Sequence, residues 1–311
     1  MKKTTTSLVG LLLFFFLCSV AFNALCFRTK REYERATLQM LTDFSAQKPF
    51  QFRILMPLAA RTVRGAVPAV PLKIIYIVLN TLGTFLLLIA FWRYLLLFFD
   101  RQAAAPGALL ILYPLLWNYG AFGNLYYPSD IPAVLFFTLG LMAIYKKRMD
   151  LFYLVFIAAT FNRETSCFLT PVFVLFGLGR IRLPKLAGHF LLQLGIWVGV
   201  KWFLDMVFQG NGGSGLYENH FSQNLYHILH PLACWDYVVQ ILLASGAVWL
   251  FIPFGWREQP RFFKQAMAVV VLFYAGMLVA GNLHETRIYN ELIPVLTAPA
   301  VVGLKKIGQR L

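Results

Sequence analysis

Long apolar runs dominate this sequence and limit what the chain can fold into. An α-helix needs about 20 apolar residues to cross the hydrocarbon core of a bilayer, and several runs here reach that length. Hydrophobic residues make up 59% of the chain and charged residues 13%. A soluble fold of this length could not cover so much apolar surface with polar side chains. The sequence therefore predicts an all-α, polytopic transmembrane helix bundle.

About ten membrane segments are expected. Their approximate ranges are 7–27, 71–92, 104–120, 130–145, 151–161, 166–179, 186–207, 237–254, 264–281 and 288–304. The fifth and sixth are too short to cross a bilayer alone and have the length of broken or re-entrant helices. The first follows Met1-Lys2-Lys3 and resembles a secretory signal. No small-x-small cleavage site in it is followed by a soluble mature domain, so we expect it to remain as a helix.

Basic residues between the segments indicate which loops face the cytoplasm, because cytoplasmic loops carry an excess of lysine and arginine. Clusters fall after every second segment and hold 16 of the 28 Lys and Arg residues. The clusters are Lys2/Lys3, Arg93/Arg101, Lys146/Lys147/Arg148, Arg180/Arg182/Lys185, Arg257/Arg261/Lys264 and Lys305/Lys306/Arg310. We therefore expect a multi-pass protein of a bacterial cytoplasmic (inner) membrane, with both termini in the cytoplasm.

The same rule decides how the stretch 151–179 folds. One continuous helix would reverse the membrane orientation of every later segment. It would place nine basic residues, from Arg180 to Arg310, outside the cell. Two short segments that meet at Asn162-Arg163-Glu164 keep all nine inside. The sequence therefore predicts a broken pair of helices in this stretch.

This topology makes the whole chain, 1–311, a single transmembrane domain with several outer loops. The outer parts are 28–70, 121–129, 162–165, 208–236 and 282–287. In the first periplasmic loop, 28–70, we expect interfacial amphipathic helices. Residues 31–44 place apolar side chains on one helical face, and Pro57 favours the start of a second helix at Leu58 to Val63. The loop 208–236 begins with a glycine-rich stretch and is predicted to be flexible.

Charged groups at membrane depth are costly, and they persist where they are paired or functional. Asp130 stands at the mouth of the fourth segment, with Pro132 just inside it. Either Ser129 or Asp130 caps a helix there, or Asp130 acts as a general base or orients a substrate hydroxyl.

The tip of the broken pair carries a second group of candidates. The charges of Arg163 and Glu164 each need an ion-pair partner. The two residues either pair with each other or find a partner on another helix. The functional alternative is that Arg163 holds a phosphate with its fork of donors. Asn162 stands beside them.

A third group follows the ninth segment, at His284, Glu285, Arg287 and Glu291. Arg287 and Glu291 are one helical turn apart and can pair. Glu285 then has no obvious local partner, so we expect this group to take part in a site.

The first outer loop adds basic and acidic candidates. Arg53 suits a lipid phosphate or pyrophosphate, or makes headgroup contacts only. Glu32 can pair with a neighbouring arginine, while Glu34 or Asp43 is free to face a cavity.

Other chemistries are not indicated. The sequence has no P-loop, no GxGxxG after a strand, no HExxH and no GxSxG, which argues against ATP-driven transport and against serine or zinc hydrolysis. No cofactor is predicted, and a divalent metal is left open because carboxylates alone do not specify one. The formal net charge of +15 lies in the topology clusters, so membrane lipids and no nucleic acid are expected as partners.

Four features together resemble the GT-C class of polytopic glycosyltransferases. They are acidic residues in a large outer loop after the first helix, the stretch from Phe52 to Pro57, the tip Asn162 to Thr165, and Glu285-Thr286-Arg287. The class takes sugars from a polyprenyl-phosphate carrier. The resemblance implies inverting transfer at the outer face, with a carboxylate base and basic residues on the lipid phosphate. Where the class usually has an aspartate behind the first helix, this chain has Glu32 or Glu34.

The resemblance assigns roles to the candidates. Asp130, Glu34 and Glu285 are the catalytic carboxylates; Arg53, Arg163 and Arg287 bind the phosphate of the lipid carrier; Glu164, His284, Glu291 and Asn162 support them. The partner would be a polyprenyl-phosphate-linked sugar used for cell-envelope polysaccharide. A transporter (flippase) of a lipid-linked glycan and a non-enzymatic partner in polysaccharide assembly are the alternatives. The nearly uncharged inner halves of the segments favour an enzyme over a transporter.

Overall fold

The computed structural model describes residues 7–29, 31–120, 125–213, 215 and 217–310. In these ranges the chain is all-α, and β pairing occurs as isolated bridges, such as the one between Glu32 and Tyr126. Three parts of the predictions lie outside the described residues. They are the basic pair Lys2/Lys3, residues 121–124 of the second outer loop and Ser214 of the glycine-rich stretch.

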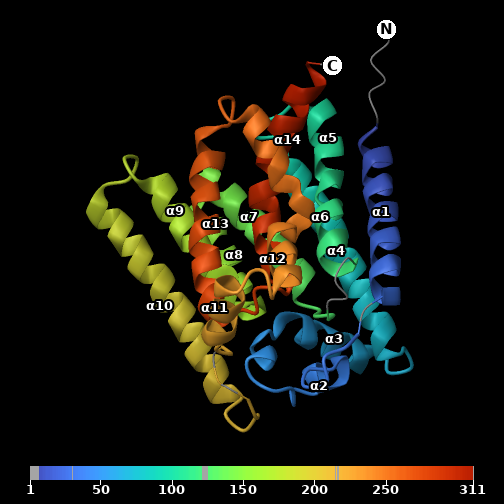
Figure 1. Cartoon of the computed structure of the whole chain (residues 1–311). Coiled ribbons are helices and arrows are strands. Elements are labelled where there is room, and N and C mark those ends of the chain that lie inside the picture. The colour runs from blue at the N-terminus through green and yellow to red at the C-terminus, as the bar shows by residue number, and fades with distance from the viewer. Residues whose placement is uncertain (1–6, 30, 121–124, 214, 216, 311) are drawn as a thin grey trace.

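The helices form one bundle (Figure 1). In chain order the elements are α1 (Leu8–Thr29), α2 (Leu38–Thr42), η1 (Phe50–Phe52), α3 (Leu55–Ala66), α4 (Leu72–Leu95), α5 (Arg101–Leu110), α6 (Leu112–Gly120), α7 (Asp130–Tyr145), α8 (Met149–Asn162), η2 (Glu164–Phe168), α9 (Leu169–Gly177), α10 (Leu183–Val207), α11 (Phe221–Leu229), α12 (Trp235–Leu242), η3 (Ala244–Gly255), α13 (Arg261–Ala280), η4 (Thr286–Leu292) and α14 (Ile293–Gly308). Figure 1 shows α1 beginning and α14 ending at one end of the bundle, here called the terminal end. The short helices α2, α3 and α11 lie at the opposite end, here called the loop end.

Several helices have the length and composition of membrane spans. Among the described residues, α1, α4, α10 and α13 are long and apolar enough to cross a bilayer, and α12 with η3, bent by 53°, would make a fifth span. The helices α7 and α8 and the stretch Glu164–Gly177 are apolar but shorter. Large apolar side chains such as Val9 and Val271, 76% and 72% exposed, cover the outside of the bundle. Such a surface suits lipid and not water, which indicates a membrane protein.

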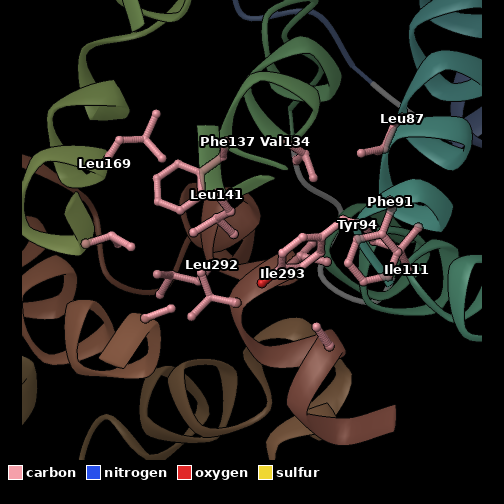
Figure 2. Close-up of a cluster of buried hydrophobic side chains, with 14 of the residues drawn as sticks. Leu87, Phe91, Tyr94, Ile111, Val134, Phe137, Leu141, Leu169, Leu292 and Ile293 are labelled. Atoms are coloured by element: carbon pink, nitrogen blue, oxygen red, sulfur yellow. The ribbon is translucent and has the colours of Figure 1, made fainter. Parts of the chain in front are cut away.

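The helix α7 runs through the interior and carries much of the core. It packs against α4, α8 and α9. Figure 2 shows Val134, Phe137 and Leu141 of α7 among side chains from α4, α9 and the start of α14. A Cβ at Gly140 would lie 2.7 Å from Leu169, so the glycine allows α9 to approach α7 closely. This packing fixes the first residue of α7, Asp130, at the loop end.

The predicted break in 151–179 is confirmed. Helix α8 ends at Asn162, Arg163 is extended (φ −161°, ψ 144°), and η2 and α9 follow. The two helices lie alongside each other, since the ring of Phe152 stacks on that of Phe173 at 5.6 Å. The turn between them carries Arg163 and Glu164 into the loop end.

The first outer loop differs in part from the prediction. Residues 31–36 form bridges and turns instead of a helix, and α2 covers only Leu38–Thr42. A local polar bond takes the place of the first helical turns, since the carboxylate of Glu32 accepts from the amide of Leu38. The Thr37 hydroxyl accepts from the amide of Met40 and caps the start of α2. The second helix is confirmed and is longer than predicted. It is α3, Leu55–Ala66, with Pro57 in its first turn.

The loops at the loop end are bonded to one another. The side-chain amide of Asn211 donates to the carbonyls of Phe44 and Ala46, at 3.0 and 2.7 Å. Further along the same loop, Asn224 of α11 donates to the carbonyl of Gly281 at 2.7 Å. The loop 208–236 is therefore anchored to the first outer loop and to the end of α13.

Candidate active site

Three arginines and four carboxylates converge at the loop end, and Arg163 is the most deeply buried of the three arginines. Its Nη1 is 3.0 Å from Asp130 Oδ1, and its Nε is 3.3 Å from Glu291 Oε1. All three side chains are buried, and the Thr165 hydroxyl also donates to Glu291. One buried cation thus holds together the start of α7, the break after α8 and the end of η4.

The second pair joins the first outer loop to the same break. Arg53 follows η1, and its Nη2 is 2.6 Å from Glu164 Oε1. Its guanidinium lies over the rings of Phe50 and Tyr127, at 5.6 and 5.7 Å from their centroids. Lys201 of α10, also buried, donates to the Thr160 carbonyl near Glu164.

The third pair is Arg287 with Glu285, both at the start of η4. The guanidinium of Arg287 lies 3.9 Å from the ring centroid of Tyr127. Tyr127 in turn stacks on Phe50 at 5.5 Å. One tyrosine ring therefore contacts two guanidinium groups, Arg53 and Arg287, and holds them near each other.

These groups line a cavity of about 250 Å³. Its walls carry Arg53, Arg163 and Arg287, the carboxylates Glu164, Glu218 and Glu285, and the aromatic rings of Tyr33, Phe50, Tyr127 and Tyr217. Glu218, Tyr217 and His220 come from the anchored loop 208–236, which thus forms one side of the cavity. The cavity is open to solvent at this wall, because the side chain of Glu218 is 33% exposed.

Three arginine nitrogens in this site are buried without a hydrogen-bond partner. They are Arg53 Nη1, Arg287 Nε and Arg163 Nε, of which the last has only its ionic contact with Glu291 at 3.3 Å. A buried, unsatisfied N–H of a charged group is costly, so the site favours a ligand that brings acceptor oxygens. Phosphate oxygens match guanidinium donors well.

Glu285 is the most accessible carboxylate of the three pairs, with 28% of its side chain exposed. Burial raises its pKa, but the charge and hydrogen bond of Arg287 outweigh that effect and hold the pKa below the usual value. Burial lowers the pKa of the neighbouring His284, whose ring packs edge-on against Tyr237 at 4.5 Å. At neutral pH the site therefore presents an ionised Glu285 beside an uncharged imidazole.

The other predicted site residues are placed as follows. Asn162 donates to the Ser129 carbonyl at 2.9 Å, behind the cavity. Glu291 and Asp130 lie beneath it and are fully enclosed. Glu34 is exposed and does not line the cavity. Of the three predicted catalytic carboxylates, the structure brings Asp130 and Glu285 to this cluster, and Glu34 lies outside it.

Several predicted pairings are wrong. Ser129 occupies the N-cap position of α7 without a capping hydrogen bond, and Asp130 bonds Arg163 instead of the helix start. Of the two alternatives for Arg163, the pair with Glu164 does not form, and the partner on another helix does, since Arg163 pairs with Asp130 of α7 and with Glu291. Arg287 pairs with Glu285, so the pairing with Glu291 does not form. The i, i+4 rule failed because η4 is a 3-10 helix, in which residues four apart do not share a face.

Sequence reasoning missed the aromatic part of the site. Tyr127, Phe50 and Tyr33 pack on one another and on the arginines. A usable signal was present, since Phe50 and Tyr127 each stand within three residues of a predicted site residue. Lys201 was also missed, although a lysine inside an apolar run is itself a signal.

Among the described residues, no group of three or more histidine, cysteine or acidic side chains is arranged to hold a metal ion. No family model, curated protein or solved structure matches the chain. Its function is therefore inferred from the geometry of the site.

Proposed function

We propose that this protein transfers a sugar from a lipid-phosphate carrier to a lipid or glycan acceptor at the outer face of the cytoplasmic membrane, as GT-C enzymes do. The observation that carries the proposal is the cavity at the loop end. There Arg53 and Arg287, each with an N–H that has no protein hydrogen-bond partner, line the same cavity as the ionised Glu285. Cationic donors beside a carboxylate base are what such a transfer needs.

The arginines supply the electrostatic part of the reaction. When the bond between the anomeric carbon and the phosphate oxygen breaks, its electron pair leaves with the phosphate, which gains negative charge. Arg53 and Arg287 are held by Tyr127 and by their carboxylates before any substrate binds. Preorganised donors of this kind stabilise developing charge without reorganisation.

Glu285 supplies the base. The acceptor hydroxyl attacks the anomeric carbon from the side opposite the phosphate and gives its proton to the Glu285 carboxylate. Support for Glu285 over Asp130 comes from access, since Asp130 is fully buried and bonded to Arg163. Asp130 and Glu291 then position Arg163 beneath the cavity.

The proposed topology is ten membrane segments with the cavity outside. It is supported by the basic clusters from Arg93/Arg101 to Lys305/Lys306/Arg310, which lie in the turns and helix ends at the terminal end, opposite the cavity. At the terminal end α1 begins and α14 ends (Figure 1). The first outer loop carries eight further lysines and arginines at the loop end. Four of the ten proposed segments are single long helices, and the other six would be made by shorter helices or by pairs such as α5 with α6 or α12 with η3.

The test is a transfer assay with full-length protein in nanodiscs. Synthetic polyprenyl-phosphate hexoses and pentoses serve as donors, the host's total lipid extract serves as acceptor, and products are identified by mass. We expect product with the native chain. Glu285→Gln should lower kcat by about 10²-fold or more, the usual range for a general base. Glu34→Gln, a change at an exposed residue outside the cavity, should have the native rate.

A parallel assay in liposomes follows a fluorescent polyprenyl-phosphate sugar across the bilayer. The labelled lipid could cross the bilayer while no sugar is transferred to any acceptor. That result would contradict the proposal and indicate a flippase. Full activity of Glu285→Gln would remove Glu285 as the base.

A further inference from the structure

A second and larger cavity, of about 480 Å³, lies at the terminal end of the bundle. It is formed by the turn between α7 and α8, the end of α9 and the start of α10. Figure 1 shows α10 leaning away from the bundle toward this end. The cavity shares no lining residue with the candidate active site.

The polar part of this cavity is strongly basic. Lys147, Arg180, Arg182 and Lys185 line it together with His189, and none of its lining residues is acidic. The nearby Asp150 is paired with Arg148, at 2.7 Å. The active-site cavity is different, because there each arginine has a carboxylate partner. Four uncompensated positive charges favour an anionic ligand.

The rest of the lining is apolar. Ile144, Met149, Phe173, Phe176 and Ile181 form this wall. Arg180 lies at the boundary between the two parts: its guanidinium is 3.9 Å from the ring centroid of Phe176, and its Nη1 donates to the Phe176 carbonyl at 3.2 Å. The basic group is thus held directly above the apolar wall.

We propose that this cavity binds one anionic phospholipid, with its phosphate on Lys147, Arg180 and Lys185 and an acyl chain along Phe173 and Phe176. Basic pockets between membrane helices recognise anionic headgroups in this way. A soluble phosphate compound would satisfy the charges but would leave the apolar wall uncovered. The combination of charge and apolar surface is therefore specific to a lipid. This inference needs only that the bundle lies in a membrane and is independent of the proposed transferase activity.

The test counts bound lipids on the full-length protein by native mass spectrometry, from detergent containing either phosphatidylglycerol or phosphatidylcholine. The native chain should keep one phosphatidylglycerol at concentrations where phosphatidylcholine is lost. The triple variant Lys147→Gln/Arg180→Gln/Lys185→Gln should bind phosphatidylglycerol at least about tenfold more weakly. The matched control, Arg257→Gln/Arg261→Gln/Arg310→Gln, removes three exposed charges at the same end outside the cavity. It should bind as the native chain does.

Equal weakening in both triple variants would overturn the proposal, because binding would then follow surface charge and not this cavity. Displacement of the lipid by soluble glycerol phosphate at equal concentration would also overturn it and assign the site to a free phosphate compound. The altered residues are exposed, so folding should survive, as elution and melting temperature will show. The single variants Arg180→Gln and Lys185→Gln, each expected to weaken binding, give the answer if the triple variant does not fold.

Discussion

Arg163 shows how a charge is kept inside an apolar bundle. Its guanidinium is almost completely enclosed and lies between the carboxylates of Asp130 and Glu291. A buried ion pair of this kind gives little net stability compared with apolar packing, but removal of one member leaves the other charges unpaired. Here the loss of the arginine would leave two buried carboxylates close together.

Arg163→Gln should therefore destabilise the protein by about 3–5 kcal/mol, the usual cost of breaking a buried pair. The measurement is thermal unfolding in detergent, where the variant should melt well below the native chain. Arg148→Gln is the control, since Arg148 pairs with Asp150 on the surface at 2.7 Å, and exposed pairs contribute little. Equal melting temperatures for Arg163→Gln and the native chain would show that this ion pair does not stabilise the fold.

At this scale the sequence predicted which residues matter better than it predicted their partners. Arg53, Arg163 and Arg287 were expected to share a site, and they do converge, because charged residues in apolar surroundings are conspicuous in a sequence. The partners named for Arg287 and, in one of two alternatives, for Arg163 were near in the chain. No protein partner was predicted for Arg53, which pairs with Glu164, 111 residues away, because only the packing of the helices brings the two together.

The close packing of α14 against η3 depends on a glycine, Gly303. A Cβ on Gly303 would overlap the Phe251 carbonyl oxygen. Near its start, η3 contains three consecutive residues with left-handed backbone, Ser245, Gly246 and Ala247. The Tyr113 hydroxyl donates to the Gly246 carbonyl at 3.0 Å and holds this turn against α6.

Gly303→Ala should destabilise the fold by about 1–3 kcal/mol, because the overlap involves backbone that can move only if the two helices separate. Gly195→Ala on α10 is the matched control, with nothing within 4 Å of the added Cβ. Alanine is the better helix former, so the control should be neutral or slightly stabilising. The melting temperatures of the two variants, each compared with that of the native chain, measure these effects. A native melting temperature for Gly303→Ala would contradict the close contact.

Helices and breaks could be predicted from the sequence where one sequence rule decided the local structure. The break at Arg163 followed from counting basic residues, and α3 followed from Pro57. The helix expected over 31–44 forms only as α2. The Glu32 carboxylate accepts a hydrogen bond from the Leu38 amide, and such side-chain bonds compete with the backbone bonds of a helix. Amphipathic spacing alone does not reveal that competition.

The whole molecule has two chemically different ends. At the loop end, arginines and carboxylates are matched in pairs around a cavity. At the terminal end, a larger cavity carries basic groups with no acidic group in its lining. Between them lies the apolar core around α7 (Figure 2). The two cavities therefore lie at opposite ends of the bundle.

Sidedness can be measured by cysteine labelling in intact cells. In a background where the four native cysteines are replaced by serine, Glu34→Cys at the loop end should react with a membrane-impermeant maleimide. Arg257→Cys at the terminal end should react only after the cells are opened, since basic loops face the cytoplasm. Both positions are exposed. Labelling of Arg257→Cys from outside would invert the proposed topology.

The buried contacts of Arg163 also bear on biogenesis. The early part of the chain contributes Arg53, Asp130 and Arg163, whereas Glu291 stands in the last stretch before α14. During synthesis the nascent chain must hold Arg163 with only one of its two acids until that stretch leaves the ribosome. A chain truncated before residue 282 would lack Glu285, Arg287 and Glu291 together, so quality-control proteases should recognise it as an unfinished bundle.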